Sequence, residues 1–218
     1  MQVFYLHGFA SSARSSKAAY FAGRLAEYAI GLRTPDFNEP DFSTLTITRM
    51  VGQVGVAMDA AGEGPSVLIG SSLGAFVAIQ AALQRPRDIS RLILLAPALD
   101  FGGNRMCSLG EVGIHEWLRS DRLDVFHYGY GRVMPVHYEL YADARRYDSM
   151  NATLSMPVQV FQGRHDAALD PETVEDWSRA RPYVELHVLD DDHQLLQSLD
   201  YVWIEMVRFL ELRTRRSP

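Results

Sequence analysis

Apolar and polar residues follow one another in blocks along the chain, and the blocks repeat in the order strand then helix. The predicted strands are short, mostly apolar runs bounded by turn residues. They lie at Gln2–His7, Ile30–Thr34, Ser66–Gly70, Leu92–Ala96, Val158–Phe161 and Val184–Leu189. The run Leu92–Ala96 is continuously apolar, which is typical of a strand buried on both faces of a parallel sheet.

Segments with apolar residues at helical spacing lie between and after these runs. We expect helices at Ser16–Tyr28, Leu45–Ala60, Leu73–Gln84, Pro171–Ala180 and Leu195–Leu212. Strands that alternate with helices form a parallel sheet with helices on both faces. The pattern therefore predicts an α/β fold with a doubly wound, mostly parallel six-stranded sheet.

The alternation lapses between Asp100 and Met156, in a stretch that is too long for a plain loop in a compact domain. Its aromatic residues are Phe101, Trp117, Phe126, Tyr128, Tyr130, Tyr138, Tyr141 and Tyr147. We expect helices there near Leu109–Ser120 and Tyr138–Asp148. A chain of 218 residues suits one domain. We therefore predict a single domain over residues 1–218, with a small helical cap inserted at about 101–150.

Composition and charge narrow the class of protein. Apolar residues make up 47% of the chain, and the net charge of −6 comes without the basic stripe that nucleic-acid binding requires. No apolar run approaches the roughly 20 residues that span a bilayer, and the first residues lack a secretory-signal pattern. Cys107 is the single cysteine, so no internal disulfide forms, and we interpret it as an incidental thiol. We expect a cytoplasmic monomer or homodimer with no nucleic-acid partner and no membrane span.

The strongest chemical motif is Gly70-Ser71-Ser72-Leu73-Gly74, which joins an apolar strand to a helix. This is the pattern of a nucleophile elbow, in which a serine on a sharp, strained turn projects above the sheet. The residues two positions before and after the serine must be small, and Gly70 and Gly74 are. Two alternatives remain: a glycine-rich turn with an N-capping serine, and Ser71 as the reactive hydroxyl, although Ser71 lacks symmetric glycine neighbours.

A serine needs a base to become a useful nucleophile. Among seven histidines, His193 is the best candidate. It follows the last strand and the acidic turn Asp190–Asp192, and it precedes the final helix. A loop at that position can hold an imidazole over Ser72. The alternative is a surface histidine near a helix N-terminus.

The imidazole in turn needs a carboxylate that fixes its tautomer. Asp166 lies on the loop after Val158–Phe161, at the carboxyl end of a strand, where open α/β sheets build their sites. Asp100 is an alternative. Asp170 is another, although it precedes Pro171 and is typical of a helix N-cap.

Acyl transfer also needs donors for a developing oxyanion. Gly8 follows the first strand and allows close approach of the backbone, so we expect the N–H groups of Phe9 and Leu73 to serve. We expect His7 to brace this loop. Neither His-x-x-x-His nor the alternating ligands of a calcium loop occur, so we predict no metal.

These residues resemble the α/β-hydrolase superfamily. Within it, Tyr5-Leu6-His7-Gly8-Phe9, followed by Ser11-Ser12 and Ser16-Lys17-Ala18, is similar to the small YqiA-type bacterial esterases. The resemblance implies the α/β-hydrolase fold, hydrolysis of esters or thioesters without a cofactor, and a triad of Ser72, Asp166 and His193. The segment Phe101–Tyr147 is longer and more aromatic than in the smallest such esterases, and we expect substrate preference to be set there.

The combined expectation is a carboxylesterase-like serine hydrolase that cleaves small-molecule esters of short or medium acyl chains through an acyl-enzyme. The side chains of Phe9, Phe101, Met106 and Trp117 either line its acyl pocket or form the core of the cap. A thioesterase, or an amidase or aminopeptidase, on the same triad is an alternative. So is a non-catalytic ligand-binding protein on the same scaffold.

Overall fold

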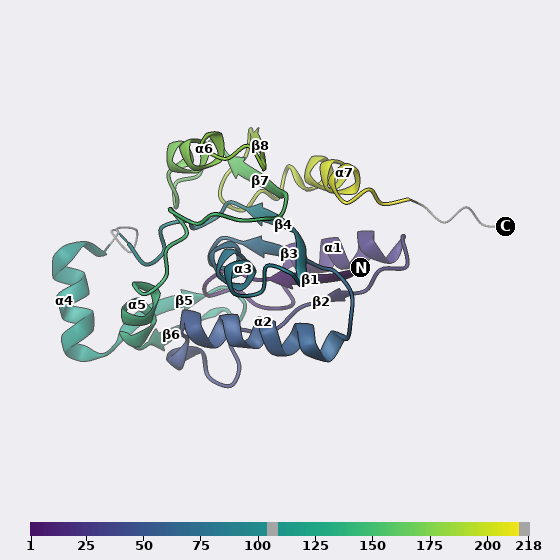
Figure 1. The fold of residues 1–218 in the computed structure, drawn as a ribbon. Helices are drawn as coiled ribbons and strands as arrows, with labels where there is room; N and C mark the ends of the chain where they lie inside the picture. Colours follow the sequence, from purple (N-terminus) through teal and green to yellow (C-terminus); the bar gives the residue numbers. More distant parts are fainter. Residues whose placement is uncertain (104–108, 214–218) are drawn as a thin grey trace.

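Six parallel strands form the central sheet of the computed structural model, which describes residues 1–103 and 109–213 (Figure 1). The strands are β1 (Gln2–Leu6), β2 (Leu32–Arg33), β3 (Ser66–Ser71), β4 (Ile89–Leu95), β7 (Val158–Gly163) and β8 (Val184–Leu189). Their order across the sheet is β2-β1-β3-β4-β7-β8, and every neighbouring pair is parallel. The six strands expected from the apolar runs are confirmed.

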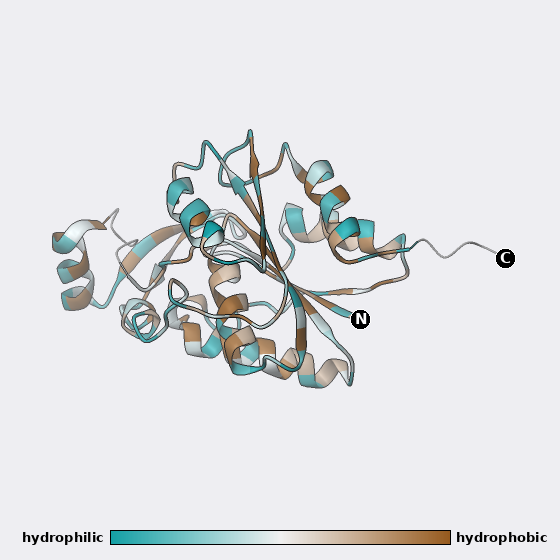
Figure 2. Ribbon diagram, turned by 45° about the horizontal axis from the view of Figure 1, so that its top comes forward, coloured by the Kyte–Doolittle hydropathy of each residue, from teal (hydrophilic) through white to brown (hydrophobic). Residues whose placement is uncertain are grey.

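Helices cover both faces of this sheet. They are α1 (Ser16–Ala26), α2 (Ile47–Ala61), α3 (Leu73–Gln84), α6 (Pro171–Arg179) and α7 (Leu199–Phe209), with a short 3-10 turn at Phe42–Thr44. Alternate residues of β3 show the two layers: Val67 packs with α1 and α7, whereas Leu68 packs with α2, α3 and α6. The apolar strands run between these layers (Figure 2). The chain adopts the predicted doubly wound α/β architecture.

The insertion lies to one side of the sheet and contains more than helices (Figure 1). Its elements are α4 (Gly110–Ser120), β5 (Leu123–His127), β6 (Arg132–Val136) and α5 (Glu139–Ala144). Strands β5 and β6 form an antiparallel hairpin that the sequence analysis did not predict. The sequence of β5 and β6 does not show the usual alternation of a strand, because the polar His127 occupies a buried position and Pro135 lies within β6.

Trp117 belongs to the core of the insertion. Its side chain is buried, its Nε1 donates a hydrogen bond to the Val136 carbonyl at 2.9 Å, and its ring meets Tyr138 edge-on. Of the two roles considered for this residue, the structure favours cap core. Met106 and Cys107 lie outside the described residues. Within the described ranges, no helix combines the length and apolar character needed to cross a bilayer.

The start of α3 lies in contact with the end of β1. Leu6 pairs with Gly70 in the sheet, and α3 then passes directly over the backbone of β1. A Cβ atom added at Gly74 would lie 2.0 Å from the Leu6 carbonyl oxygen, and one at Gly70 would lie 2.5 Å from the Ala75 Cα. Only glycine fits at these two positions, because the obstructing atoms are backbone.

Replacement of Gly74 by alanine should therefore destabilise the fold. We expect Gly74→Ala to lower the free energy of unfolding by about 3 kcal/mol, measured by urea denaturation, because the helix must move off the sheet. Gly52→Ala is the matched control, since Gly52 is exposed in α2 and its added Cβ meets nothing. That variant should gain roughly 0.5–1 kcal/mol from helix propensity. Equal stability of the two variants would contradict the proposed steric constraint.

Candidate active site

Ser72 occupies the turn between β3 and α3 in a strained backbone conformation, with φ 53° and ψ −115°. A non-glycine residue rarely adopts such a positive φ. Hydrogen bonds hold it there: the Ser72 N–H donates to the Leu95 carbonyl at 2.9 Å, and its own carbonyl accepts from the N–H groups of Ala75 and Ala98. Strain of this kind, fixed by the surrounding backbone, is typical of functional residues.

A hydrogen-bonded line joins the three residues singled out in the sequence. His193 Nε2 lies 3.1 Å from Ser72 Oγ, and His193 Nδ1 lies 2.7 Å from Asp166 Oδ2. The carboxylate accepts from Nδ1–H, which leaves Nε2 free to accept from the serine hydroxyl. The structure thus brings together a hydroxyl, an imidazole and a carboxylate that are far apart in sequence, with the imidazole within hydrogen-bond distance of both other groups.

The carboxylate of Asp166 is buried and fully hydrogen-bonded. Its Oδ1 accepts from the N–H groups of Ala168 and Leu169 at 2.9 and 2.8 Å, and its Oδ2 accepts from Gln162 at 3.1 Å as well as from His193. Burial acts to raise the pKa of Asp166, but the hydrogen bond and charge of His193, together with the hydrogen bonds from Leu169 and Gln162, hold the pKa below its usual range. The carboxylate is therefore ionised at neutral pH.

The other two carboxylates considered for the acid lie elsewhere. Asp170 is the N-cap of α6 and accepts from the Glu172 N–H at 3.2 Å, as its position before a proline indicated. Asp100 lies in the wall of a hollow beside Ser72. The carboxylate that meets the imidazole belongs to Asp166.

The loop that carries His193 is braced by charged neighbours. Asp192 accepts from the Gln194 N–H at 2.7 Å, and the Lys17 ammonium donates to the Gln194 carbonyl at 2.9 Å. Burial lowers the pKa of Lys17 to about 8, although Asp192 and Asp191 act in the opposite direction. Sequence reasoning missed this contact, because lysine in the first turn of a helix is ordinarily exposed.

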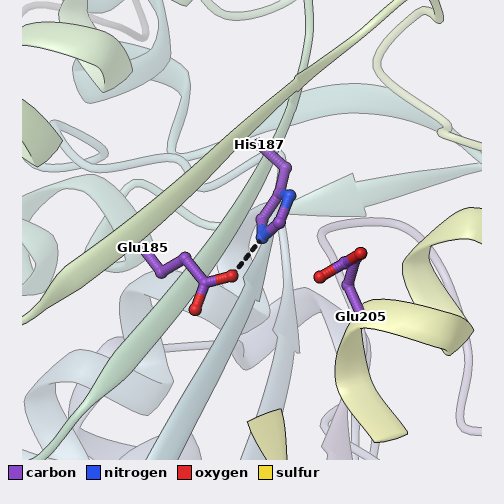
Figure 3. Close-up of side chains that lie close together, drawn as sticks. All are labelled: Glu185, His187 and Glu205. Carbon is purple, nitrogen blue, oxygen red and sulfur yellow. Dashed lines mark hydrogen bonds and ion pairs between the residues drawn. The ribbon is translucent and has the colours of Figure 1, made fainter. Parts of the chain in front are cut away.

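A separate cluster of ionisable side chains joins β8 to α7 (Figure 3). Glu185, His187 and Glu205 bring their ligand-type atoms within 4.8 Å of one another, and His187 donates to Glu185 at 2.8 Å. Arg208 bonds to both glutamates and supplies positive charge between them. The arrangement acts as an ion-pair cluster. Sequence spacing gave no sign of it, because Glu205 comes from a different element.

The loop after β1 packs directly on the serine turn. A Cβ added at Gly8 would lie 3.2 Å from the Ser71 carbonyl oxygen and 3.3 Å from the Ser72 Cβ. Among the described residues, no hydrogen bond is donated by the backbone N–H of Phe9 or of Leu73. Both N–H groups belong to segments that border Ser72.

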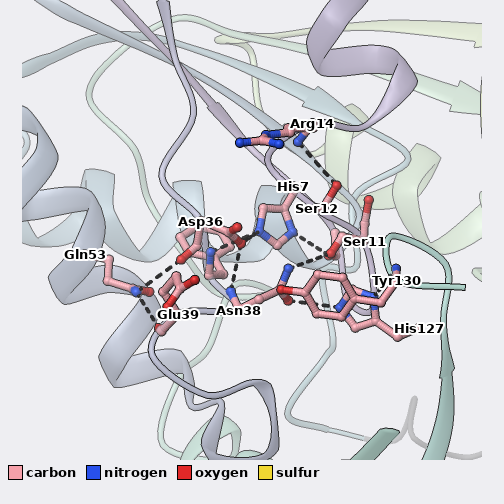
Figure 4. A network of polar contacts seen from close by, with 12 residues as sticks. His7, Ser11, Ser12, Arg14, Asp36, Asn38, Glu39, Gln53, His127 and Tyr130 are labelled. Atoms are coloured by element: carbon pink, nitrogen blue, oxygen red, sulfur yellow. Dashed lines mark hydrogen bonds and ion pairs between the residues drawn. The ribbon is translucent and has the colours of Figure 1, made fainter. Parts of the chain in front are cut away.

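Two histidines hold this loop and the hairpin together (Figure 4). His7 Nδ1–H donates to the Gly8 carbonyl at 3.0 Å, and its Nε2 accepts from the Phe37 N–H at 3.0 Å. His127 donates to Asn38 Oδ1 at 3.1 Å, and the Asn38 amide donates to the Ser11 carbonyl at 2.9 Å. The network ties the insertion to the segment beside Ser72.

Two hollows meet at Ser72 and share Phe9 as a wall. The smaller, of about 150 Å³, is mainly apolar and includes Leu99, Phe101 and Val174. The larger, of about 990 Å³, is more polar and includes His193. Phe9 and Phe101 thus line the smaller hollow, as one of the two interpretations of the sequence predicted.

Neutralising Asp166 should weaken the fold in a pH-dependent way. A carboxyl with a lowered pKa contributes stability that is present above about pH 4 and is lost as the pH falls through the folded-state value. We expect Asp166→Asn to cost about 1–3 kcal/mol near pH 7 and much less near pH 3, measured by denaturant unfolding. Glu63→Gln, at an exposed position, should show no such trend. A pH-independent cost would contradict the ionised state of Asp166.

Comparison with known proteins places the chain in a family. A model described as an uncharacterised protein family, UPF0227, matches residues 2–211. The chain is also similar to lipase LipV of Mycobacterium tuberculosis, at 34% identity over 89 residues, covering 38% of this chain and 34% of the lipase. The match therefore spans about a third of that lipase.

Solved structures share the fold over nearly the whole chain. A candidate hydrolase from Agrobacterium vitis S4 is 21% identical, with a TM-score of 0.85, covering 97% of this chain and 88% of that one. Mouse α/β-hydrolase domain-containing protein 10 is 18% identical, with a TM-score of 0.80 and coverage of 96% and 89%. Est1E of Butyrivibrio proteoclasticus, with ferulic acid bound, is 18% identical, with a TM-score of 0.78 and coverage of 97% and 88%. Identities this low show a common fold.

The family match and the structural matches agree with each other. The family model covers the chain from β1 to the end of α7, and the solved structures reproduce the parallel sheet with its helices. Both results agree with the resemblance carried by the opening segment and by the turn at Ser72. The chain belongs to the protein family UPF0227 and has the fold of the α/β-hydrolases.

Proposed function

We propose that this protein is a carboxylesterase-like serine hydrolase in which Ser72 is the nucleophile, His193 the base and Asp166 the acid that orients the base. The observation that carries the proposal is the continuous line of hydrogen bonds from Ser72 Oγ through the imidazole to the Asp166 carboxylate. A strained serine aligned with a base and an orienting acid is the arrangement that activates a hydroxyl.

Acylation begins when Ser72 Oγ attacks the ester carbonyl carbon and its proton passes to His193 Nε2. The carbonyl oxygen becomes an oxyanion, which the N–H groups of Phe9 and Leu73 stabilise. The carbon–oxygen bond to the alcohol then breaks, and the imidazolium returns the proton to the departing alkoxide. The products are free alcohol and an acyl group on Ser72. Asp166 stabilises the positive imidazole throughout.

Deacylation repeats these steps with water. His193 removes a proton from a water molecule, and the hydroxide attacks the acyl carbonyl carbon. The second tetrahedral intermediate collapses, the bond to Ser72 Oγ breaks, and the imidazolium returns the proton to the serine. One ester and one water molecule thus give one acid and one alcohol. The residues that act in this cycle all belong to this chain.

The size of the apolar hollow supports short or medium acyl groups. An apolar cavity of about 150 Å³ holds a benzene ring in other proteins. The hollow beside Ser72 has about that volume, and Leu99, Phe101 and Val174 give it apolar walls. An acyl group of roughly six carbons, or a single aromatic ring, fits the space. The names of the similar lipase and of Est1E are consistent with ester substrates.

Removal of the Ser72 hydroxyl should abolish hydrolysis. We expect Ser72→Ala to lower kcat for p-nitrophenyl butyrate by about 10⁴-fold or more with an unchanged circular dichroism spectrum, because no other group forms the acyl-enzyme. Ser71→Ala is the control, since this neighbour is buried and has no bond to His193. It should retain most activity and still react with a fluorophosphonate probe. Turnover retained in Ser72→Ala would remove Ser72 from its role.

Acidification should also slow the reaction. A protonated imidazole cannot accept the Ser72 proton, so we expect kcat/KM for p-nitrophenyl butyrate to fall as the solution is acidified. The fall belongs to His193, because the lowered pKa of Asp166 keeps that carboxylate charged over the same range. A rate that stays constant down to pH 4.5 in a folded sample would contradict a histidine base.

A further inference from the structure

The position of His193 indicates which hollow holds the acyl group of an ester and which holds the alcohol. In the proposed reaction the imidazolium returns a proton to the departing oxygen, so the alcohol lies within hydrogen-bond reach of His193 Nε2. The larger hollow is bordered by His193, whereas the smaller apolar hollow has no His193 in its walls. The acyl group therefore occupies the small hollow, and the alcohol occupies the large one.

The large hollow suits a bulky polar group. Its volume of about 990 Å³ is at the upper end for small-molecule sites. One wall is the segment that follows β1 and enters α1, with hydroxyls from Ser11, Ser12, Ser15 and Ser16. The hairpin closes part of the hollow through Tyr128, whose ring is largely exposed. These hydroxyls make the wall polar, so it suits a polar alcohol better than a small hydrocarbon alcohol.

The charged side chains around this hollow differ in their partners and in their exposure, and they include the exposed carboxylate of Asp192. His193 bonds to Asp166 and His165 bonds to Asp190. Lys17 is held in the electrostatic field of Asp192.

Arg14 differs from the buried Lys17: its side chain is exposed, and it makes no ion pair with any residue that the structure describes. The hollow therefore presents an exposed guanidinium beside several serine hydroxyls.

We propose that the substrates are esters of a small acyl group with a large polar alcohol that carries an anionic group, which Arg14 binds. The proposal rests on the hydrolase function proposed above and adds the chemistry of the alcohol. A guanidinium binds a phosphate or carboxylate through paired hydrogen bonds, and the neighbouring hydroxyls donate to the remaining oxygens. The apolar hollow then limits the size of the acyl group, and binding of the anionic group selects the alcohol.

Three butyrate esters test this assignment with the acyl group held constant. They are 1-butyryl-glycerol 3-phosphate, 1-monobutyrin and butyrylcholine, whose polar alcohols are anionic, neutral and cationic. We expect kcat/KM, followed by butyrate release, to be about tenfold or more higher for the phosphate ester than for the neutral one. Butyrylcholine should be the poorest of the three. Equal values for the phosphate and neutral esters would overturn the inference.

The variant Arg14→Gln tests the residue. It should remove the preference for the phosphate ester while leaving kcat/KM for monobutyrin within about twofold, because a neutral alcohol gains nothing from the guanidinium. Arg87→Gln is the matched control, since Arg87 is exposed in the α3–β4 connection, at the opposite end of the strands. A preference that persists in Arg14→Gln would overturn the role of Arg14.

The same assays separate failure of the inference from failure of the proposed function. If the wild-type protein cleaves p-nitrophenyl butyrate through Ser72 but shows no preference among the three polar esters, the inference fails and the hydrolase function stands. If it cleaves none of the four butyrates and does not react with a fluorophosphonate, the proposed function fails, and the inference fails with it.

Discussion

The contact between the start of α3 and the end of β1 is the constraint on which the site depends. With no side chain at Gly70 or Gly74, the helix approaches the backbone of Leu6 closely enough to force a sharp turn between them. The turn places Ser72 at φ 53°, and neighbouring backbone groups hold it there. The strain is tolerated because the sheet and the helix fix both ends of the turn. The hydroxyl is thereby presented at the edge of the sheet.

The order of the strands then determines which loops reach that hydroxyl. Asp166 follows β7 and His193 follows β8, and these two strands are neighbours in the sheet. Their carboxyl ends lie at the same edge as the end of β3, because all the strands are parallel. The imidazole of His193, on the loop after β8, contacts both Ser72 and Asp166 and so joins the three side chains. The buried Lys17 and the exposed Asp192 both bond to the backbone of Gln194 and hold the bridging loop in place.

The insertion makes the two sides of the site chemically different. Phe101 brings an aromatic ring to the apolar hollow, while the hairpin places Tyr128 over the polar hollow. His127 and Asn38 fasten the hairpin to the segment that follows β1, so one network supports both the hairpin and the wall that bears Arg14. An ester held across Ser72 would meet an apolar surface on its acyl side and a hydroxyl-rich, positively charged surface on its alcohol side. The chemical difference between the two sides is a property of the packed molecule.

The sequence by itself determined the strands, the main helices, the turn at Ser72 and the loops of Asp166 and His193. These features depend on local pattern and on the rule that parallel strands end at one edge, so distant contacts were not needed to find them. Only the tertiary structure decided the hairpin β5–β6, the burial of Lys17, the Glu185–His187–Glu205 cluster and the exposure of Arg14 beside the polar hollow. Each of these arises when segments far apart in the chain pack together, and the residues concerned are common surface residues when considered one by one. Burial and pairing are properties of neighbours in space, which a local pattern does not contain.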